Sequence, residues 1–133
     1  MKILVTGCAG FIGFHLTQDL LEKSNYEIVG IDNLNSYYDV KLKKLRLQVL
    51  KNYKSNFKFK KIDLNNNKSL EQLFKIYKFD YVIHLAAQAG VRYSITNPDA
   101  YINSNISGFF NIINLNKKFK VKHFIFASTS SVY

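Results

Sequence analysis

The sequence predicts an α/β fold built on a doubly wound parallel sheet of about five strands. Short apolar runs alternate with longer segments of helical periodicity along the whole chain. This alternation is typical of parallel strands joined by helical crossovers. Most of the runs are apolar throughout, as expected for strands that helices cover on both faces. The rules for connections in such sheets favour the strand order 3-2-1-4-5.

Three strands and two helices are expected in the first half of the chain. The strands lie at 2–6, 27–31 and 57–62, and the helices at 11–23 and 40–52. The expected apolar positions of the first helix are Ile12, Leu16 and Leu20. Those of the second helix are Leu42, Leu45, Leu47 and Val49, set among lysines. Each helix is therefore predicted to pack one apolar stripe against the sheet.

The second half continues the same alternation. An amphipathic helix is expected at 69–78, apolar strands at 81–85 and 122–127, and a long helix at 97–118. The long helix has a start signal, because Asn97 can cap its first turn and the proline that follows needs no amide hydrogen bond there. The chain therefore supplies the fourth and fifth strands of one sheet.

A glycine motif lies between the first strand and the first helix. Gly7, Gly10 and Gly13 have the spacing G-x-x-G-x-x-G, and Asp32 follows the second strand. The first glycine allows a tight turn, the second lets the backbone approach a pyrophosphate, and the third lets the helix pack closely. The helix N-terminus attracts phosphate, and the acid can accept bonds from a ribose. The motif predicts a Rossmann-like site for NAD, since a carboxylate at Asp32 repels the 2′-phosphate of NADP.

Composition excludes several other classes. The chain has 133 residues, 47% of them hydrophobic, and a single cysteine, Cys8, so we expect one domain without a disulfide. No apolar segment suits a signal peptide or a membrane span, and we expect a cytoplasmic protein. His15, His84 and His123 lack metal-ligand spacing. The net charge is +10, with many lysines between 41 and 61, which we interpret as a solvated helix face rather than a nucleic-acid or membrane surface.

Further segments resemble a known family. They are TGCAGFIG (6–13), DNLNSYYD (32–39), HLAAQAGVRYSI (84–95), NPDAYINSN (97–105) and STSSVY (128–133). In these segments the chain resembles the extended short-chain dehydrogenase/reductase family and, within it, the NAD-dependent nucleotide-sugar 4-epimerases. The segments 32–39 and 84–95 are most similar to those of the UDP-glucuronate 4-epimerases.

The resemblance implies a set of cofactor contacts beyond the glycines. Asp63 and Leu64 would hold the adenine, and Ser128 would lie at the nicotinamide end. The whole expected NAD-binding set is Gly7, Gly10, Phe11, Ile12, Gly13, Asp32, Asn33, Asp63, Leu64, Leu85, Ala86, Ala87, Gln88, Ser104, Asn105 and Ser128.

The resemblance also implies residues for the sugar. Thr129 falls at the family's catalytic Ser/Thr position, where its hydroxyl would orient the C4 oxygen of the sugar. Arg92, Ser130 and Ser131 are candidates for the hexuronate carboxylate, because a cation and hydroxyl donors suit an anion. The competing interpretations are a solvated loop arginine and an ordinary polar loop. The family's general base, the Tyr of a Tyr-x-x-x-Lys motif, would lie beyond residue 133.

We therefore expect residues 1–133 to be the N-terminal part of an NAD-binding domain, without the substrate domain and without turnover on its own. The expected whole enzyme interconverts UDP-glucuronate and UDP-galacturonate through a 4-keto intermediate and forms a homodimer. Three alternatives remain at this point: another NAD-dependent sugar epimerase or 4,6-dehydratase, a binding-only dinucleotide module, and a nucleic-acid binder that uses the basic stretch.

Overall fold

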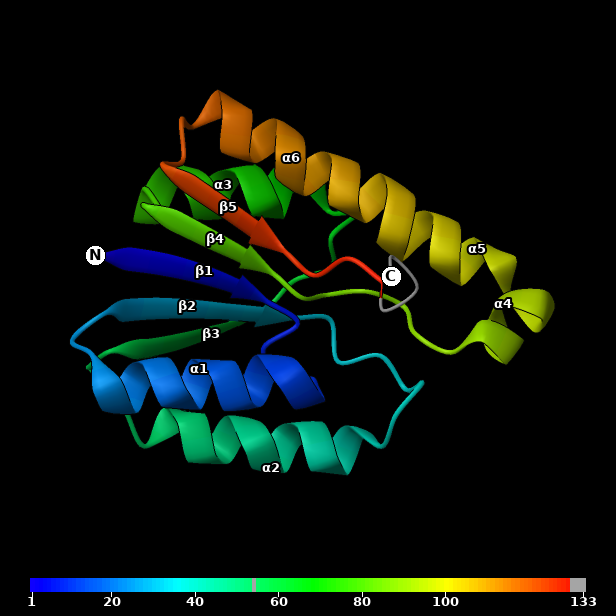
Figure 1. Ribbon diagram of the computed structural model, residues 1–133, viewed down its shortest axis with the longest axis horizontal. Helices are drawn as coiled ribbons and strands as arrows, with labels where there is room; N and C mark the ends of the chain where they lie inside the picture. Colours follow the sequence, from blue (N-terminus) through cyan, green and yellow to red (C-terminus); the bar gives the residue numbers. More distant parts are fainter. Residues whose placement is uncertain (54, 130–133) are drawn as a thin grey trace.

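The computed structural model describes residues 1–53 and 55–129. Its centre is a sheet with the order β3-β2-β1-β4-β5, in which every neighbouring pair is parallel (Figure 1). The strands are β1 (Lys2–Thr6), β2 (Glu27–Asp32), β3 (Phe57–Lys61), β4 (Tyr81–His84) and β5 (His123–Phe126). The predicted fold class and strand order are confirmed.

Helices cover both faces of the sheet (Figure 1). On one face lie α1 (Phe11–Lys23) and α2 (Val40–Lys51), and on the other α3 (Asn67–Tyr77) and α6 (Phe109–Lys118). Because successive side chains of a strand point to opposite faces, β1 divides between two cores. Ile3 and Val5 belong to the cluster with α1 and α2, whereas Leu4 belongs to the cluster with α3 and α6.

The buried face of α1 matches the prediction in part, because Leu16 and Leu20 are half-buried against the core. Ile12, expected inside, is 63% exposed, and the buried positions are Gly13, Thr17 and Leu21. Small side chains at the first two positions bring the helix close to the glycine turn. The Thr17 hydroxyl donates to the carbonyl oxygen of Gly13 at 2.6 Å, so the polar group is satisfied inside the helix. Closeness to the turn, rather than apolar bulk, sets the rotation of this helix.

The prediction for α2 is also wrong in part. Leu42, Leu45 and Val49 are exposed, and the face against the sheet consists of Lys43, Leu47 and Leu50. The cap is local and polar, because the Asp39 side chain accepts a hydrogen bond from the amide of Lys41 at 2.8 Å. A buried lysine on the inner face means that a polar partner lies beneath the helix.

The segment from 91 to 118 is more broken than predicted. It contains α4 (Val91–Thr96), α5 (Pro98–Tyr101), a π-helical stretch (Ile102–Gly108) and then α6. The predicted helix start is confirmed, since Asn97 is the N-cap residue of α5 and Pro98 follows it. The side chain of Asn97 makes no cap hydrogen bond, however, and donates to the Tyr93 hydroxyl at 2.7 Å. No pattern in the sequence predicted the short helix α4.

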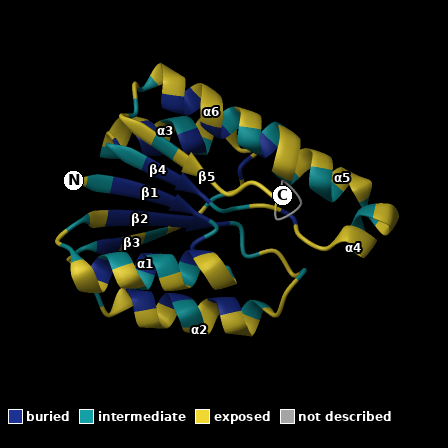
Figure 2. Cartoon of the chain, in the orientation of Figure 1, coloured by how far each residue is buried: buried dark blue, intermediate teal, exposed yellow. Residues whose placement is uncertain are grey.

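Figure 2 shows which parts of the fold are buried. The central strands β1 and β2 are almost entirely buried, whereas β5 at the edge is largely exposed. None of the helices in the described ranges is long and apolar enough to cross a membrane.

Candidate functional site

A pocket lies at the carboxyl ends of the central strands, on either side of the point where the chain order reverses between β1 and β4. In open α/β sheets this reversal leaves a crevice in which ligands bind. The described residues that line it are Gly7, Gly10, Ile31, Asp32, Asn33, Asn35, Tyr37, Tyr38, Lys43, Ile62, Asp63, Leu64, Leu85, Ala86, Ala87, Gln88 and Ser104.

The glycine turn forms the floor of the pocket at the start of α1. Gly7 has a φ of +71°, and its amide donates to the carbonyl oxygen of Ile31 at 2.8 Å. A Cβ on Gly7 would stand 2.8 Å from the backbone nitrogen of Ala86. At Gly13 a Cβ would overlap the carbonyl oxygen of Gly7. Side chains are therefore excluded here, and the bare backbone of the turn faces the pocket.

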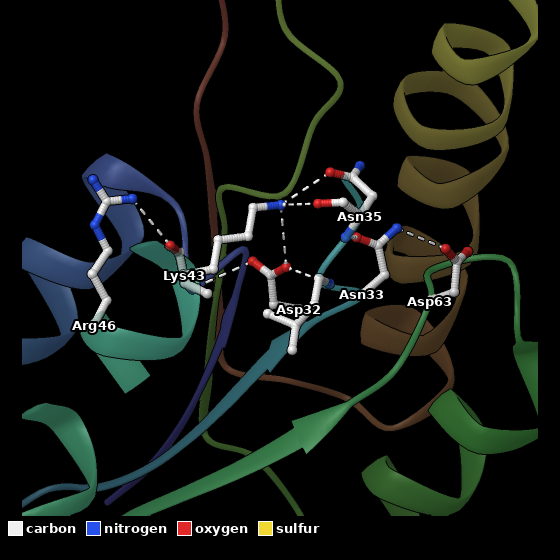
Figure 3. Close-up of polar contacts among 8 residues, drawn as sticks. Asp32, Asn33, Asn35, Lys43, Arg46 and Asp63 are labelled. Atoms are coloured by element: carbon white, nitrogen blue, oxygen red, sulfur yellow. Dashed lines mark hydrogen bonds and ion pairs between the residues drawn. The ribbon is translucent and has the colours of Figure 1, made fainter. Parts of the chain in front are cut away.

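Asp32, at the end of β2, is 9% exposed and is held by two backbone amides (Figure 3). Its Oδ1 accepts from the amide of Leu34 at 2.8 Å, and its Oδ2 accepts from the amide of Ala9 at 3.3 Å. The ammonium of Lys43 lies 3.9 Å from Oδ1. The carboxylate therefore has a fixed orientation at the wall of the pocket, with one cation beside it.

The second acid of the pocket lies after β3 (Figure 3). The Asn33 amide donates to Asp63 Oδ2 at 2.8 Å, and the backbone amide of Asn65 donates to Oδ1 at 2.9 Å. Burial acts to raise the pKa of Asp63, but these hydrogen bonds outweigh it, so the pKa lies below its usual value. Asp63 is thus a charged acceptor near neutral pH.

The segment after β4 is fastened to the π-helical stretch. The amide of Gln88 donates to Asn105 Oδ1 at 2.8 Å, and Asn105 Nδ2 donates back to the Gln88 carbonyl at 3.0 Å. Asn105 therefore supports the wall of the pocket rather than lining it, while Ser104 lines it. On the opposite rim the ring of Tyr37 packs against that of Tyr93 on α4, with centroids 4.7 Å apart.

The predicted site residues fall into two groups. Eleven of the predicted cofactor residues line one pocket, namely Gly7, Gly10, Asp32, Asn33, Asp63, Leu64, Leu85, Ala86, Ala87, Gln88 and Ser104. Those that do not line it are Phe11, Ile12, Gly13, Asn105, Arg92, Ser128 and Thr129. Phe11, Ile12, Arg92, Ser128 and Thr129 are exposed. Ser130 and Ser131 lie outside the described residues.

Sequence reasoning missed four polar lining residues: Asn35, Tyr37, Tyr38 and Lys43. The first three lie within the segment 32–39 that carried the resemblance, so a signal for them existed. Lys43 had none, because it is one lysine among several in a helix of mixed character. Across 1–53 and 55–129, no group of three His, Cys, Asp or Glu residues could hold a metal ion.

Solved structures of similar fold include NAD complexes. The chain matches the UDP-glucuronic acid 4-epimerase from Bacillus cereus, solved with UDP-glucuronic acid and NAD, at 42% identity and a TM-score of 0.89. That match covers all of this chain and 41% of the other. A UDP-glucose 4-epimerase from Thermotoga maritima, solved with UDP-glucose, matches at 36% identity and a TM-score of 0.82, over 97% of this chain and 38% of the other.

Curated relatives give the same picture. Protein CapI of Staphylococcus aureus is 49% identical over all of this chain and 39% of its own length. The UDP-glucuronate 4-epimerase of Thermodesulfobacterium geofontis is 51% identical over 98% of this chain and 40% of its own length. The chain thus spans about two fifths of the relatives it matches. The family model described as GDP-mannose 4,6 dehydratase matches residues 4–133. The chain therefore belongs to the GDP-mannose 4,6 dehydratase family.

Proposed function

We propose that this chain binds NAD and is the N-terminal part, residues 1–133, of the NAD-binding domain of a nucleotide-sugar 4-epimerase. The observation that carries the proposal is the meeting of the glycine turn and Asp32 in one pocket at the switch point of the sheet. The B. cereus enzyme, whose match covers the whole of this chain, was solved with NAD.

The pocket residues fit the cofactor group by group. The exposed backbone at Gly7 and Gly10, with the amides of Phe11 and Ile12 and the N-terminus of α1, would take the pyrophosphate. Asp32 would accept bonds from the adenosine ribose. The adenine would lie by Asn33, Asp63 and Leu64, and the rest of the dinucleotide along Leu85, Ala86, Ala87, Gln88 and Ser104. Asn105 would support this wall by its hydrogen bonds to Gln88, and Ser128 would close the nicotinamide end. Bound NAD supplies a hydride acceptor and donor for C4 of the sugar.

For the sugar we propose UDP-glucuronate and UDP-galacturonate, interconverted through a 4-keto intermediate. Thr129 would hydrogen-bond the C4 oxygen, while Arg92, Ser130 and Ser131 would face the carboxylate. The support is the name of the T. geofontis relative and the ligand of the B. cereus structure. A general base must complete the reaction, and we place it outside residues 1–133.

We further propose a homodimeric, cytoplasmic whole enzyme. An apolar row on the π-helical stretch and α6 supports the dimer. Its residues Ile102, Ile106, Phe110 and Ile113 are each at least 39% exposed and recur every three or four residues. Such rows on the surface of a protein mark contacts with other chains. The free thiol of Cys8 fits a reducing compartment. The basic stretch remains, in this proposal, a solvated surface without nucleic acid.

Cofactor binding can be tested on the 133-residue chain. We expect millimolar NAD to raise the melting temperature, because a ligand that binds only the folded state stabilises it in proportion to the logarithm of its concentration. NADP at the same concentration should have a much smaller effect, since Asp32 repels its 2′-phosphate. A melting temperature that NAD leaves unchanged would contradict the proposal.

A test of substrate choice requires the general base and the substrate domain, which we place outside residues 1–133. We would join residues 1–133 to the remaining part of the B. cereus enzyme and assay the chimera with UDP-glucuronate and UDP-glucose. The chimera should prefer UDP-glucuronate, because a site built for a carboxylate leaves polar groups unpaired with UDP-glucose. Arg92→Gln should reduce this preference. Equal use of both sugars would point instead to an epimerase of the UDP-glucose type, such as the T. maritima relative.

A further inference from the structure

Lys43 is unusual because it is a buried lysine on a helix whose other lysines face solvent. Its side chain is 8% exposed and lies at the pocket, whereas Lys41, Lys44 and Lys51 of the same helix are exposed. Burying an ammonium costs free energy unless it is paired and hydrogen-bonded. The other buried residues on this face of the helix, Leu47 and Leu50, are apolar. The fold therefore buries a charge where an apolar side chain would be expected.

The contacts of the ammonium join α2 to the loop after β2 (Figure 3). Nζ donates to the carbonyl oxygen of Asn35 at 3.1 Å and to its Oδ1 at 3.0 Å. An ammonium has three donors, and the Asp32 carboxylate lies 3.9 Å away, within ion-pair range. Lys43 therefore links the loop after β2 to α2. Its third N–H donor remains available to the Asp32 carboxylate.

If NAD binds as proposed, both charges act on the group at the 2′ position of its adenosine ribose. Asp32 is held at the pocket wall by the amides of Ala9 and Leu34, and the ammonium of Lys43 is its neighbour on that same wall. The carboxylate repels a 2′-phosphate, and the ammonium attracts one. Selectivity between NAD and NADP then depends on the balance of two opposite charges about 4 Å apart.

We propose that Lys43 is a selectivity-determining residue: it holds Asp32 and the 33–39 loop in place for NAD, and it becomes a binding group for the 2′-phosphate of NADP once the charge of Asp32 is removed. The inference rests on the proposed NAD function. It assigns to α2 a part in cofactor choice that the glycine motif and Asp32 alone do not describe.

The test compares NAD and NADP affinities of five chains by calorimetry at one ionic strength. They are the unmodified chain, Asp32→Asn, Lys43→Met, Asp32→Asn/Lys43→Met and Asp32→Asn/Lys43→Arg. Lys44→Met, which removes an exposed charge from the same helix, is the matched control. Circular dichroism melts establish that each variant is folded before binding is measured.

Asp32→Asn should bind NAD about tenfold more weakly and NADP at least about tenfold more tightly, because the ammonium is left without its counter-charge. Adding Lys43→Met should remove the gain for NADP, and adding Lys43→Arg should retain it, since a guanidinium also pairs with phosphate. Lys43→Met alone should weaken NAD severalfold through loss of the support of Asp32. Lys44→Met should change neither affinity by more than about twofold.

Equal NADP affinities for Asp32→Asn and Asp32→Asn/Lys43→Met would overturn the inference, as would no gain for NADP in Asp32→Asn. Either result could occur in a chain that binds NAD normally, so the proposed function would survive it. No binding of NAD by the unmodified chain would instead contradict the proposed function, and the inference with it. If Asp32→Asn/Lys43→Met is unfolded, Asp32→Asn/Lys43→Arg still tests the inference, because loss of the NADP gain in that variant would count against it.

Discussion

At the scale of single residues, Thr6 and His84 join the ends of β1 and β4 directly beneath the pocket. The Thr6 hydroxyl oxygen accepts from the amides of Leu85 and Ala86, at 3.2 and 3.1 Å, and lies 2.8 Å from His84 Nδ1. The hydroxyl and Nδ1 are therefore hydrogen-bond partners. Burial lowers the pKa of His84 from 6.5 to about 4, so the ring is neutral at pH 7.

The neutral His84 predicts a pH dependence of stability. The unfolded chain takes up a proton near pH 6.5, whereas the folded chain resists protonation down to about pH 4, so stability is full above 6.5 and falls as the pH drops through this window. By pH 5 the loss from this residue should be about 2 kcal/mol of unfolding free energy.

Urea denaturation at pH 7 and pH 5 measures this loss. His84→Asn, whose side-chain amide can still hydrogen-bond with Thr6, should lose about 2 kcal/mol of the difference between the two pH values. His15→Gln changes an exposed ring and should keep the full difference. The interpretation fails if His84→Asn and the unmodified chain respond to pH alike.

Cys8, in the glycine turn, is buried in the core cluster with α1 and α2, and this burial suppresses its reactivity. Burial, and secondly the negative charge of Asp32, raise the pKa of the Cys8 thiol well above its ordinary value. Because the thiolate is the nucleophile, the folded chain should react with iodoacetamide at pH 8 only after denaturant is added. Mass spectrometry measures this cleanly, since Cys8 is the chain's single cysteine. Rapid labelling without denaturant would show that the turn opens in the folded state.

At the scale of elements, the close approach of α1 to the glycine turn governs the floor of the pocket. The helix buries Gly13, Thr17 and Leu21, and its first turn packs directly against the carbonyl group of Gly7. Gly10 is different, because a Cβ there would lie 3.1 Å from the same oxygen, a contact that a small shift relieves. One glycine of the motif therefore serves packing, and another leaves room for a ligand.

A pair of alanine substitutions separates these two roles. Gly13→Ala forces a Cβ into the backbone of Gly7 and should cost about 3 kcal/mol of unfolding free energy. Gly10→Ala should cost about 1 kcal/mol, yet it should abolish the thermal shift caused by NAD, because its methyl would occupy the pyrophosphate side of the turn. Urea denaturation and NAD titration of both variants provide the measurements. Equal stability losses would mean that packing does not distinguish the two glycines.

At the scale of the whole molecule, two exposed apolar features, β5 and the row on residues 102–113, bear on association with other chains. Within the described residues β5 pairs only with β4, and Ile125 and Phe126 are 44% and 50% exposed. The row Ile102, Ile106, Phe110 and Ile113 is the second of these features. An apolar edge strand and an apolar helix face each favour association with another chain.

We expect the 133-residue chain to self-associate at micromolar concentration, which sedimentation velocity can measure. Ile106→Glu/Phe110→Glu should shift it toward the monomer, because two charges would be placed in the contact. Leu42→Glu/Leu45→Glu, which alters exposed leucines of α2, is the matched control and should not. A monomeric unmodified chain, or an equal effect of both double variants, would contradict this prediction.

The order of elements and most of the pocket were predictable because they depend on local signals. Apolar runs and helical spacing determined the strands, and the turn Gly7–Gly13 with Asp32 determined where a dinucleotide would bind. The rotation of α3 was predictable, because its apolar stripe Leu70, Leu73 and Phe74 is buried as the helical spacing indicates, whereas the rotation of α2 was not. Lys43 is inside and Leu45 outside because Asn35 and Asp32, in the loop and strand that precede the helix, supply polar partners there.

What the sequence determined by itself is therefore the fold class, the strand order and the acid after β2, since periodicity and motif spacing are properties of neighbouring residues. The tertiary structure alone decided which cation faces that acid and that His84 is neutral against Thr6. Each of these depends on groups that meet only when helices and strands pack, because burial and pairing energies arise between segments far apart in the chain.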